Sequence, residues 1–268
     1  MRITSLNLDE TISLNRKIQK EVDRQIKFME RHLKKLTIHS PEKQALKILL
    51  DHNLIRVPIP DPDWGGAIYE LPNGNKIPII NTAQPRLYQY FISWHEVYHL
   101  TEISDENATH NISTEFDLTE RKADYFASQM LISDDIFDYY HQLEQHSFID
   151  RIAFCMDMFK APYKAILIKL YESAIQCEKA DLQGEIKENF DLKYSQTYWE
   201  TKFRDLYLDD TLIKPTFIVD FGRLMEIVRD KREKYSDVEV YKDNFNFLQE
   251  LHSKFKTVKE EWSIGQLQ

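Results

Sequence analysis

The stretch LYQYFISWHEVYHL, residues 87–100, decides how this chain is interpreted. It is apolar nearly all round, which is typical of a buried helix. His95 and His99 are four positions apart, so both imidazoles project from one face of that helix and can reach a single metal ion. Glu96 follows the first histidine, where its carboxylate can take a proton from a water on that ion. The pattern is that of a zinc hydrolase.

A bare H-E-x-x-H pattern also occurs by chance, and a hydrogen-bonded core histidine is the alternative for either residue. The apolar surroundings favour a metal, because two imidazoles and a carboxylate are costly to bury without partners. A catalytic zinc takes three protein ligands and leaves one position for water. Glu120, 21 residues after His99, is the candidate for the third ligand, so the expected cofactor is Zn²⁺.

The segment that begins at Glu120, ERKADYFASQMLIS, has helical spacing of its small and apolar residues. Asp124 lies four positions after Glu120, so the two carboxylates point the same way. Asp124 is therefore expected to accept the free ring N–H of a ligand histidine. The alternative is a solvated acidic start of a helix, since acids favour the first turn.

Together the two segments resemble the ImmA/IrrE family of bacterial and phage metallopeptidases. The resemblance rests on H-E-x-x-H at 95–99 and on E-x-x-A-[DN]-x-F-A-x-x-[LM]-L at 120–131, and it extends over residues 66–172. It implies that His95, His99 and Glu120 are zinc ligands and that Glu96 is the general base. The family usually has Gly where this chain has Tyr98, so a narrower cleft is expected.

Family members are typically encoded beside helix-turn-helix repressors, which they cleave or inactivate. The resemblance therefore implies a zinc-dependent endopeptidase acting on a helix-turn-helix repressor or antitoxin-like regulator of a phage, mobile element or stress or defence system. Two alternatives stay open: a binding or sensor module that does not cleave, and a toxin or defence effector. The intact Glu96 counts against the first. Candidates for stabilising an oxyanion are His110, Tyr98 and Tyr125, and the sequence does not choose among them.

Composition agrees with an ordinary globular protein. Of 268 residues, 42% are hydrophobic and only 6 are Gly, which favours helices over tight turns. The amino terminus lacks an apolar signal core, and no run approaches the length of a membrane span, so a cytoplasmic location without membrane contact is expected. Cys155 and Cys177 are too few for a disulfide framework.

Acidic residues gather between Thr101 and Gln145, where 11 acids face 2 bases. The local net charge of −9 equals the net charge of the whole chain. Such a rim around the proposed ligands would attract a basic protein partner, such as a repressor, and repel nucleic acid. A solvated loop over 101–117 is the alternative. The oligomeric state is not indicated.

The sequence predicts an α+β fold that is mainly helical, with a zincin-like minimal core: a small antiparallel sheet, the H-E-x-x-H helix and the helix of Glu120. Three regions are expected. Residues 1–53 are helical, with a long amphipathic helix over 8–37 and a second helix from Pro41, capped by Ser40. Residues 54–177 form the peptidase core with a small helical lobe. Residues 178–268 are a helical extension without an assignable motif.

A β-hairpin is expected immediately before the zinc helix. Residues 66–71 and 76–81 flank Asn73-Gly74, a strong turn signal. A short strand over 54–59 should lie at an edge because it contains Pro58. An extended substrate could add a strand to this sheet, with Pro78 limiting which edge is available; the alternative is a hairpin that only covers the helix.

The helical pair over 148–159 and 162–171 resembles a DNA-binding helix-turn-helix in length. Its bases, Arg151, Lys160, Lys164 and Lys169, have acids close by, so packing of a small lobe is the favoured role.

Overall fold

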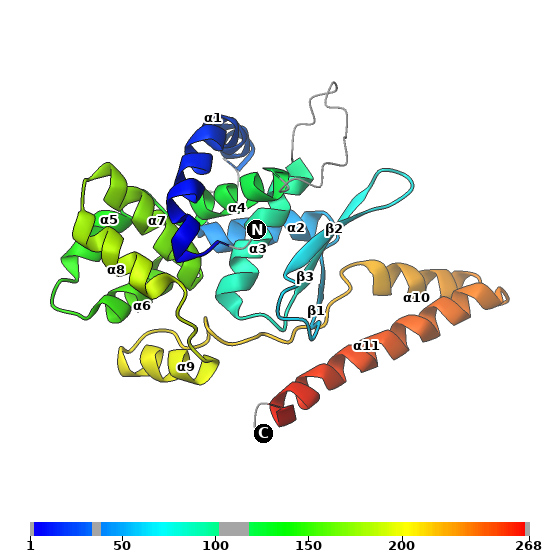
Figure 1. Ribbon diagram of the computed structural model, residues 1–268. Coiled ribbons are helices and arrows are strands. Elements are labelled where there is room, and N and C mark those ends of the chain that lie inside the picture. The colour runs from blue at the N-terminus through cyan, green and yellow to red at the C-terminus, as the bar shows by residue number, and fades with distance from the viewer. Residues whose placement is uncertain (1–2, 34–38, 102–117, 266–268) are drawn as a thin grey trace.

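The computed structural model describes residues 3–33, 39–101 and 118–265 (Figure 1). Over these residues the fold is mainly helical with one small sheet, as predicted. The strands are β1 (Ile55–Val57), β2 (Gly66–Glu70) and β3 (Lys76–Asn81). The helices are α1 (Leu8–Leu33), α2 (Pro41–Asp51), α3 (Arg86–Thr101), α4 (Leu118–Leu131), α5 (Ile136–Gln142), α6 (Phe148–Phe159), α7 (Tyr163–Gln176), α8 (Ala180–Phe190), α9 (Gln196–Asp205), α10 (Leu224–Lys234) and α11 (Glu239–Gly265), and a short 3-10 helix (Ser5–Asn7) precedes α1.

The predicted hairpin is confirmed: β2 and β3 are antiparallel, with Gly66 opposite Ile80 and Glu70 opposite Lys76. Gly74 supplies the positive φ of the turn, at 79°. β1 pairs with the other side of β3 and is parallel to it. The expectation of an antiparallel sheet was therefore wrong for β1. Because β3 inserts between two strands that run in opposite directions, it must be parallel to one of them.

β1 is an edge strand of the sheet, as predicted from its proline-containing sequence, but its outer side is covered. Arg56 N donates to Asp220 O at 2.7 Å, and Asp220 N donates to Arg56 O at 2.8 Å. Pro78 lies in the central strand, and the pairing of β3 with β1 begins one residue later, at Ile79. Among the described residues, the edge that stays open is that of β2.

α3 lies between the sheet and the other helices of the core. It packs against α4 and α2, and it contacts β2 and β3. Trp94 and Val97 on α3 are fully buried, and the Trp94 ring meets Phe126 of α4 edge to face at 6.0 Å. The sequence 87–100 is apolar nearly all round because this helix is enclosed by protein on most of its sides.

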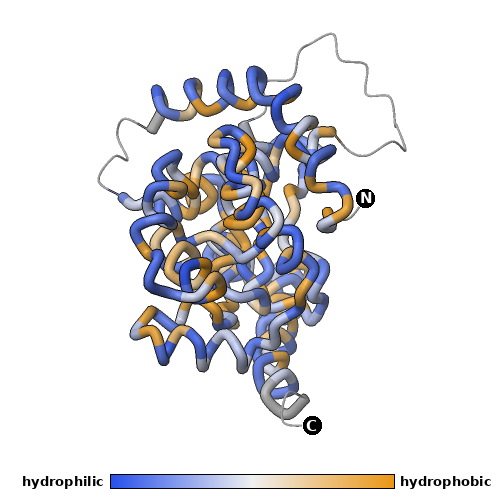
Figure 2. Tube along the Cα trace, turned by 60° about the vertical axis from the view of Figure 1, so that its left-hand side comes forward, coloured by the Kyte–Doolittle hydropathy of each residue, from blue (hydrophilic) through white to orange (hydrophobic). Residues whose placement is uncertain are grey.

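α1 is the long amphipathic helix predicted for 8–37, and its described part ends at Leu33. It packs across α4 and α7. Hydrophobic residues recur along the helices on the side that faces the interior of the protein (Figure 2). Three polar residues, Thr11, Asn15 and Gln25, are also buried on α1, at 8%, 1% and 6% exposed. The buried apolar residues of this helix are Leu8, Ile12, Ile18, Val22 and Met29.

The helical pair α6 and α7 belongs to the interior of the helical lobe. α7 is buried on several faces, including Ala165, Leu167 and Leu170. Its Lys169 is 7% exposed and donates to Gln129 Oε1 at 2.8 Å and Asp134 Oδ1 at 2.9 Å. A helix enclosed in this way cannot enter a DNA groove, so the structure agrees with packing as the role of the pair.

Helices α8 and α9 share the hydrophobic core with the regions before them, through Ile186, Phe190 and Phe203. The chain then returns along residues 206–223 to the sheet, and α10 and α11 form a pair of helices beside β1 (Figure 1). The Phe221 ring contacts the rings of His252 and Phe255 on α11. Within the three described ranges, no helix has both the length and the apolar character that crossing a membrane requires.

Candidate metal centre

Three side chains that the sequence singled out, His95, Glu96 and His99, lie in the last two turns of α3. His95 and Glu96 are 8% and 4% exposed, and the His95 and His99 rings are 4.9 Å apart between centroids. The four-residue spacing places both Nε2 atoms on the same side, 3.1 Å from each other.

Glu120 joins them from the first turn of α4, which packs against α3. Its Oε2 lies 3.0 Å from His95 Nε2, and its Oε1 lies 3.2 Å from His99 Nε2. His95, His99 and Glu120 thus form a group that could hold a metal ion. The Glu120 side chain is 54% exposed, whereas those of the two histidines are 10% and 18% exposed, so the group opens to solvent on the side of the carboxylate.

The geometry of this group suits a small tetrahedral cation. With zinc–ligand bonds of about 2.0–2.1 Å, the corners of a tetrahedron lie about 3.3–3.4 Å apart. The two Nε2 atoms lie 3.1 Å apart, and each lies 3.0–3.2 Å from a different oxygen of the Glu120 carboxylate, slightly below that edge length. Two ring nitrogens that face each other at hydrogen-bond distance need a cation between them or a proton on one of them. Two imidazoles and one carboxylate are the ligands of many catalytic zinc sites.

Asp124 occupies the position expected of a residue that orients a ligand histidine. Its Oδ1 lies 2.9 Å from His95 Nδ1, while Nε2 of the same ring faces Glu120. A proton held on Nδ1 by Asp124 leaves the Nε2 lone pair free for a metal ion.

The charges within the group are strongly coupled. Burial lowers the pKa of His95, but hydrogen bonds to Asp124 and Glu120 outweigh it and raise the pKa to about 10. Hydrogen bonds from His95 and His99 hold the pKa of Glu120 well below its usual range. The raised pKa favours a proton on His95 in the absence of a metal ion, and a bound metal ion must displace that proton.

Glu96 is held between α3 and the start of β2. Burial raises its pKa to about 7, although the neighbouring histidines favour its charged form. Gly66 faces it so closely that a Cβ there would lie 3.0 Å from Glu96 Oε1 and 2.8 Å from Ile79 O. Glycine at the first position of β2 thus allows the strand to approach this carboxylate.

Polar anchors fix the end of α3, and the sequence analysis missed them. Gln25 of α1 donates to Thr101 O at 2.7 Å and to Thr101 Oγ1 at 2.8 Å. Lys76 of β3 donates to His99 O at 3.1 Å, which satisfies a carbonyl at the helix end. A polar residue on the apolar face of a helix, as at Gln25, is a signal that could have indicated the first of these contacts.

The other site candidates are placed as follows. Tyr98 belongs to the hydrophobic core, 5% exposed, with its ring 5.5 Å from that of Phe126, so it does not narrow a cleft as expected. Tyr125 is 4% exposed and lines a cavity beside α4. His110 lies outside the described residues, as do five of the 11 acids counted between 101 and 145: Glu102, Asp105, Glu106, Glu115 and Asp117.

No family model matches the chain, and neither a curated protein nor a solved structure is significantly similar to it. What can be said of the site therefore rests on its own geometry and on the motif residues.

Proposed function

We propose that this protein is a zinc-dependent endopeptidase. The observation that carries the proposal is the convergence of His95 Nε2, His99 Nε2 and the Glu120 carboxylate within 3.0–3.2 Å of one another. A buried Glu96 beside them supplies the base that peptide hydrolysis requires. A site for metal storage or a structural zinc would need no such carboxylate and is usually closed by four protein ligands.

His95, His99 and Glu120 would hold the ion, and Asp124 would fix the orientation of the His95 ring. When bound, zinc would polarise the scissile carbonyl and acidify a water molecule. Glu96 would take the proton of the attacking water at its carboxylate and return it to the leaving amine. Its burial suits this role, because burial brings the pKa of the carboxyl group close to neutrality, where the group can both accept and release a proton.

An extended peptide fits the open edge of β2. The outer edge of β1 is covered by the backbone of Asp220, so a substrate strand would have to pair with β2. Pro78 lies in the central strand β3, so it does not limit the outer edge of β2. A substrate strand paired with β2 would pass Gly66, whose neighbourhood includes Glu96. Main-chain hydrogen bonds would then align the scissile bond with the base.

The motif resemblance to ImmA/IrrE peptidases supports a helix-turn-helix repressor or an antitoxin-like regulator as the substrate. The net charge of −9 between 101 and 145 favours a basic partner. The decisive experiment incubates the protein with a helix-turn-helix repressor, the first choice being one whose gene is found beside its own. The zinc-loaded protein should cut it into discrete fragments, and a chelator should stop the cleavage. If it stays intact while forming a stable complex, the protein is a binding module instead.

A further inference from the structure

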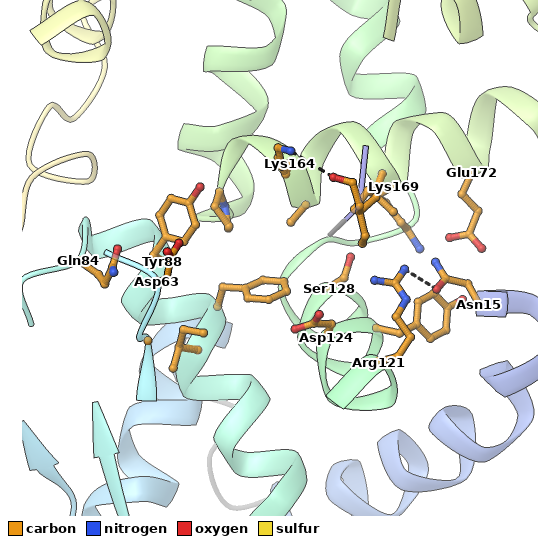
Figure 3. A pocket seen from close by; sticks show the side chains of 18 of the residues that line it. Asn15, Asp63, Gln84, Tyr88, Arg121, Asp124, Ser128, Lys164, Lys169 and Glu172 are labelled. Atoms are coloured by element: carbon orange, nitrogen blue, oxygen red, sulfur yellow. Dashed lines mark hydrogen bonds between the residues drawn. The ribbon is translucent and has the colours of Figure 1, made fainter. Parts of the chain in front are cut away.

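A second feature of the core is a partly open cavity of about 510 Å³ between α1, α3, α4 and α7, which is also lined by residues of the chain before α3. Figure 3 shows Arg121, Asn15 and Glu172 gathered at one end, and Gln84, Tyr88 and Asp63 at the other. The volume falls in the range of sites for small organic ligands.

In the part of the chain that the structure describes, the polar end carries one buried hydrogen-bond donor without an acceptor and a guanidinium with a single hydrogen bond. Arg121 Nη2 donates to Asn15 Oδ1 at 2.7 Å. Within the described ranges, the guanidinium has no other hydrogen bond and no carboxylate at ion-pair distance. Asn15 is 1% exposed, and its Nδ2 has no hydrogen-bond partner among the described residues. Donors left unpaired at a buried position are costly unless an acceptor fills the space in front of them.

The remaining charged groups of the inner wall are engaged elsewhere. Lys169 binds Gln129 and Asp134, and Asp124 accepts from His95. Glu172 is 5% exposed, and burial raises its pKa while the charges of Lys169 and Arg121 lower it. Among the described residues, no carboxylate lies at ion-pair distance from Arg121.

Apolar side chains also line the cavity. They include Phe91 and Ile92 of α3, Ala165 and Ile168 of α7, and Pro162. A ligand must therefore join a hydrophobic body to an anionic end. The polar groups of a phosphate or a sugar would lie against these apolar side chains and lose their hydration there, which costs free energy.

We propose that this cavity binds a small monocarboxylate with an apolar or aromatic body, its carboxylate held by Arg121 and Asn15 and its body packed against Phe91, Ile92 and Ile168. The guanidinium of Arg121 and the amide of Asn15 can each donate to one carboxylate oxygen, and the bond from the guanidinium is charge-assisted. The site is distinct from the metal ligands, and its occupancy is measured by binding, so the proposal does not depend on peptidase activity.

The carboxylate could belong to a free metabolite or to the carboxyl terminus of a short peptide. Calorimetry on the full chain loaded with zinc distinguishes these sources. The probes are 4-phenylbutyrate, its amide, the tripeptide Gly-Gly-Phe and the amide of that tripeptide. We expect at least one carboxylate to bind and its amide to bind at least tenfold more weakly, since charge-assisted hydrogen bonds are worth about a factor of ten or more. Tighter binding of the tripeptide identifies a peptide terminus as the source.

Two variants locate the bound carboxylate. Arg121→Gln should weaken binding by about tenfold to a hundredfold. The matched control is Lys122→Gln, since the ammonium of Lys122 pairs with Glu21 and lies outside the cavity lining; it should leave the affinity unchanged. Asn15→Asp keeps the size of the side chain and an acceptor for Arg121, but it places a fixed negative charge where the ligand carboxylate would lie.

Asn15→Asp should abolish binding while zinc content and the thermal midpoint stay close to those of the parent. This variant decides the matter if Arg121→Gln does not fold. The proposal is overturned if neither carboxylate binds, if carboxylates and amides bind equally, or if Asn15→Asp retains the affinity of the parent.

Discussion

Asp124 Oδ1 accepts a hydrogen bond from Nδ1 of His95 over 2.9 Å, and the same ring turns Nε2 toward Glu120. Asp124 and Glu120 are one turn apart on α4. A single helix therefore carries both the proposed third metal ligand and the carboxylate that holds the His95 ring. Any displacement of α4 relative to α3 would disturb the two contacts together, so the proposed metal site depends on the packing between these helices.

Metal content is the first test of the site. The parent should contain about one zinc per chain, because a catalytic site takes three protein ligands and water. His95→Ala and His99→Ala should abolish binding, and Glu120→Ala should weaken it strongly. Elemental analysis after dialysis measures this, with His52→Ala as the control since its ring bonds only to Ile48 O in the described structure. Full zinc occupancy in His99→Ala would contradict the assignment.

Asp124→Asn tests the residue that orients His95. Replacing a carboxylate partner of a ligand histidine typically costs about 10–100-fold in metal affinity or activity. The zinc dissociation constant of Asp124→Asn, measured by competition with a chelator, should rise by that factor. Asp138→Asn, on α5, makes the same chemical change away from the ligands and should have no effect. Equal zinc dissociation constants for the two variants would mean that Asp124 does not contribute to zinc binding.

Glu96→Gln separates cleavage from metal binding. The amide keeps the size and shape of the side chain but cannot take a proton, so zinc content should be normal and cleavage of the repressor should be lost. Removing a general base typically slows a reaction by about 10²–10⁴-fold. The measurement is fragment formation over time at equal zinc loading. Undiminished biological activity in Glu96→Gln would favour a binding module over an enzyme.

The acidic stretch between 101 and 145 should steer a basic partner. Raising salt from low to physiological levels should slow association, since exposed charges are screened beyond about 8–10 Å. Neutralising four acids there, Asp105, Glu106, Glu115 and Asp117, should slow it similarly and leave zinc content intact. The control removes the same charge from the helical pair beside β1, at Glu226, Asp230, Glu233 and Glu239. Stopped-flow rates that match the parent for the first variant at low salt would reduce the stretch to a solvated loop.

The two thiols should differ in reactivity. Cys155 is fully buried, and burial raises its pKa to about 12, so at pH 8 it is both enclosed and protonated. Cys177 is exposed. A thiol reagent should therefore modify one thiol in the native protein and two after unfolding. Rapid modification of both thiols in the native state would show that α6 opens readily, and Cys177→Ser provides the control for assignment.

The local parts of this structure could be predicted from the sequence because they depend on short periodicities. The four-residue spacing of His95 and His99, the Asn73-Gly74 turn and the apolar stripe of α1 each fix an element by themselves. Glu120 and Asp124 could be placed because the spacing within α4 is also local, although their distance from α3 was known only once both helices were packed.

Long-range pairings were beyond the sequence. The parallel arrangement of β1 and β3 depends on how a loop crosses the sheet, and the contact between Arg56 and Asp220 joins residues 164 positions apart. The cavity at Arg121 needed four helices in place before Asn15 could be recognised as part of it. The position of Asn15 on the apolar face of α1 could have indicated a buried polar contact, but the sequence did not indicate which residue Asn15 contacts.

The return of residues 206–223 to the sheet has a consequence for solubility. Asp220 occupies the backbone groups of β1 through two hydrogen bonds, and its carboxylate binds Arg56 Nη2 at 2.6 Å. Gly222 lets the chain come this close, since it has φ 54° and a Cβ there would lie 2.9 Å from Leu54 O. A chain truncated after α9 would leave the Arg56 N–H and C=O without these partners, at a strand edge where a strand of another molecule could pair. The contact with Asp220 thus covers part of a sheet edge that would otherwise favour aggregation.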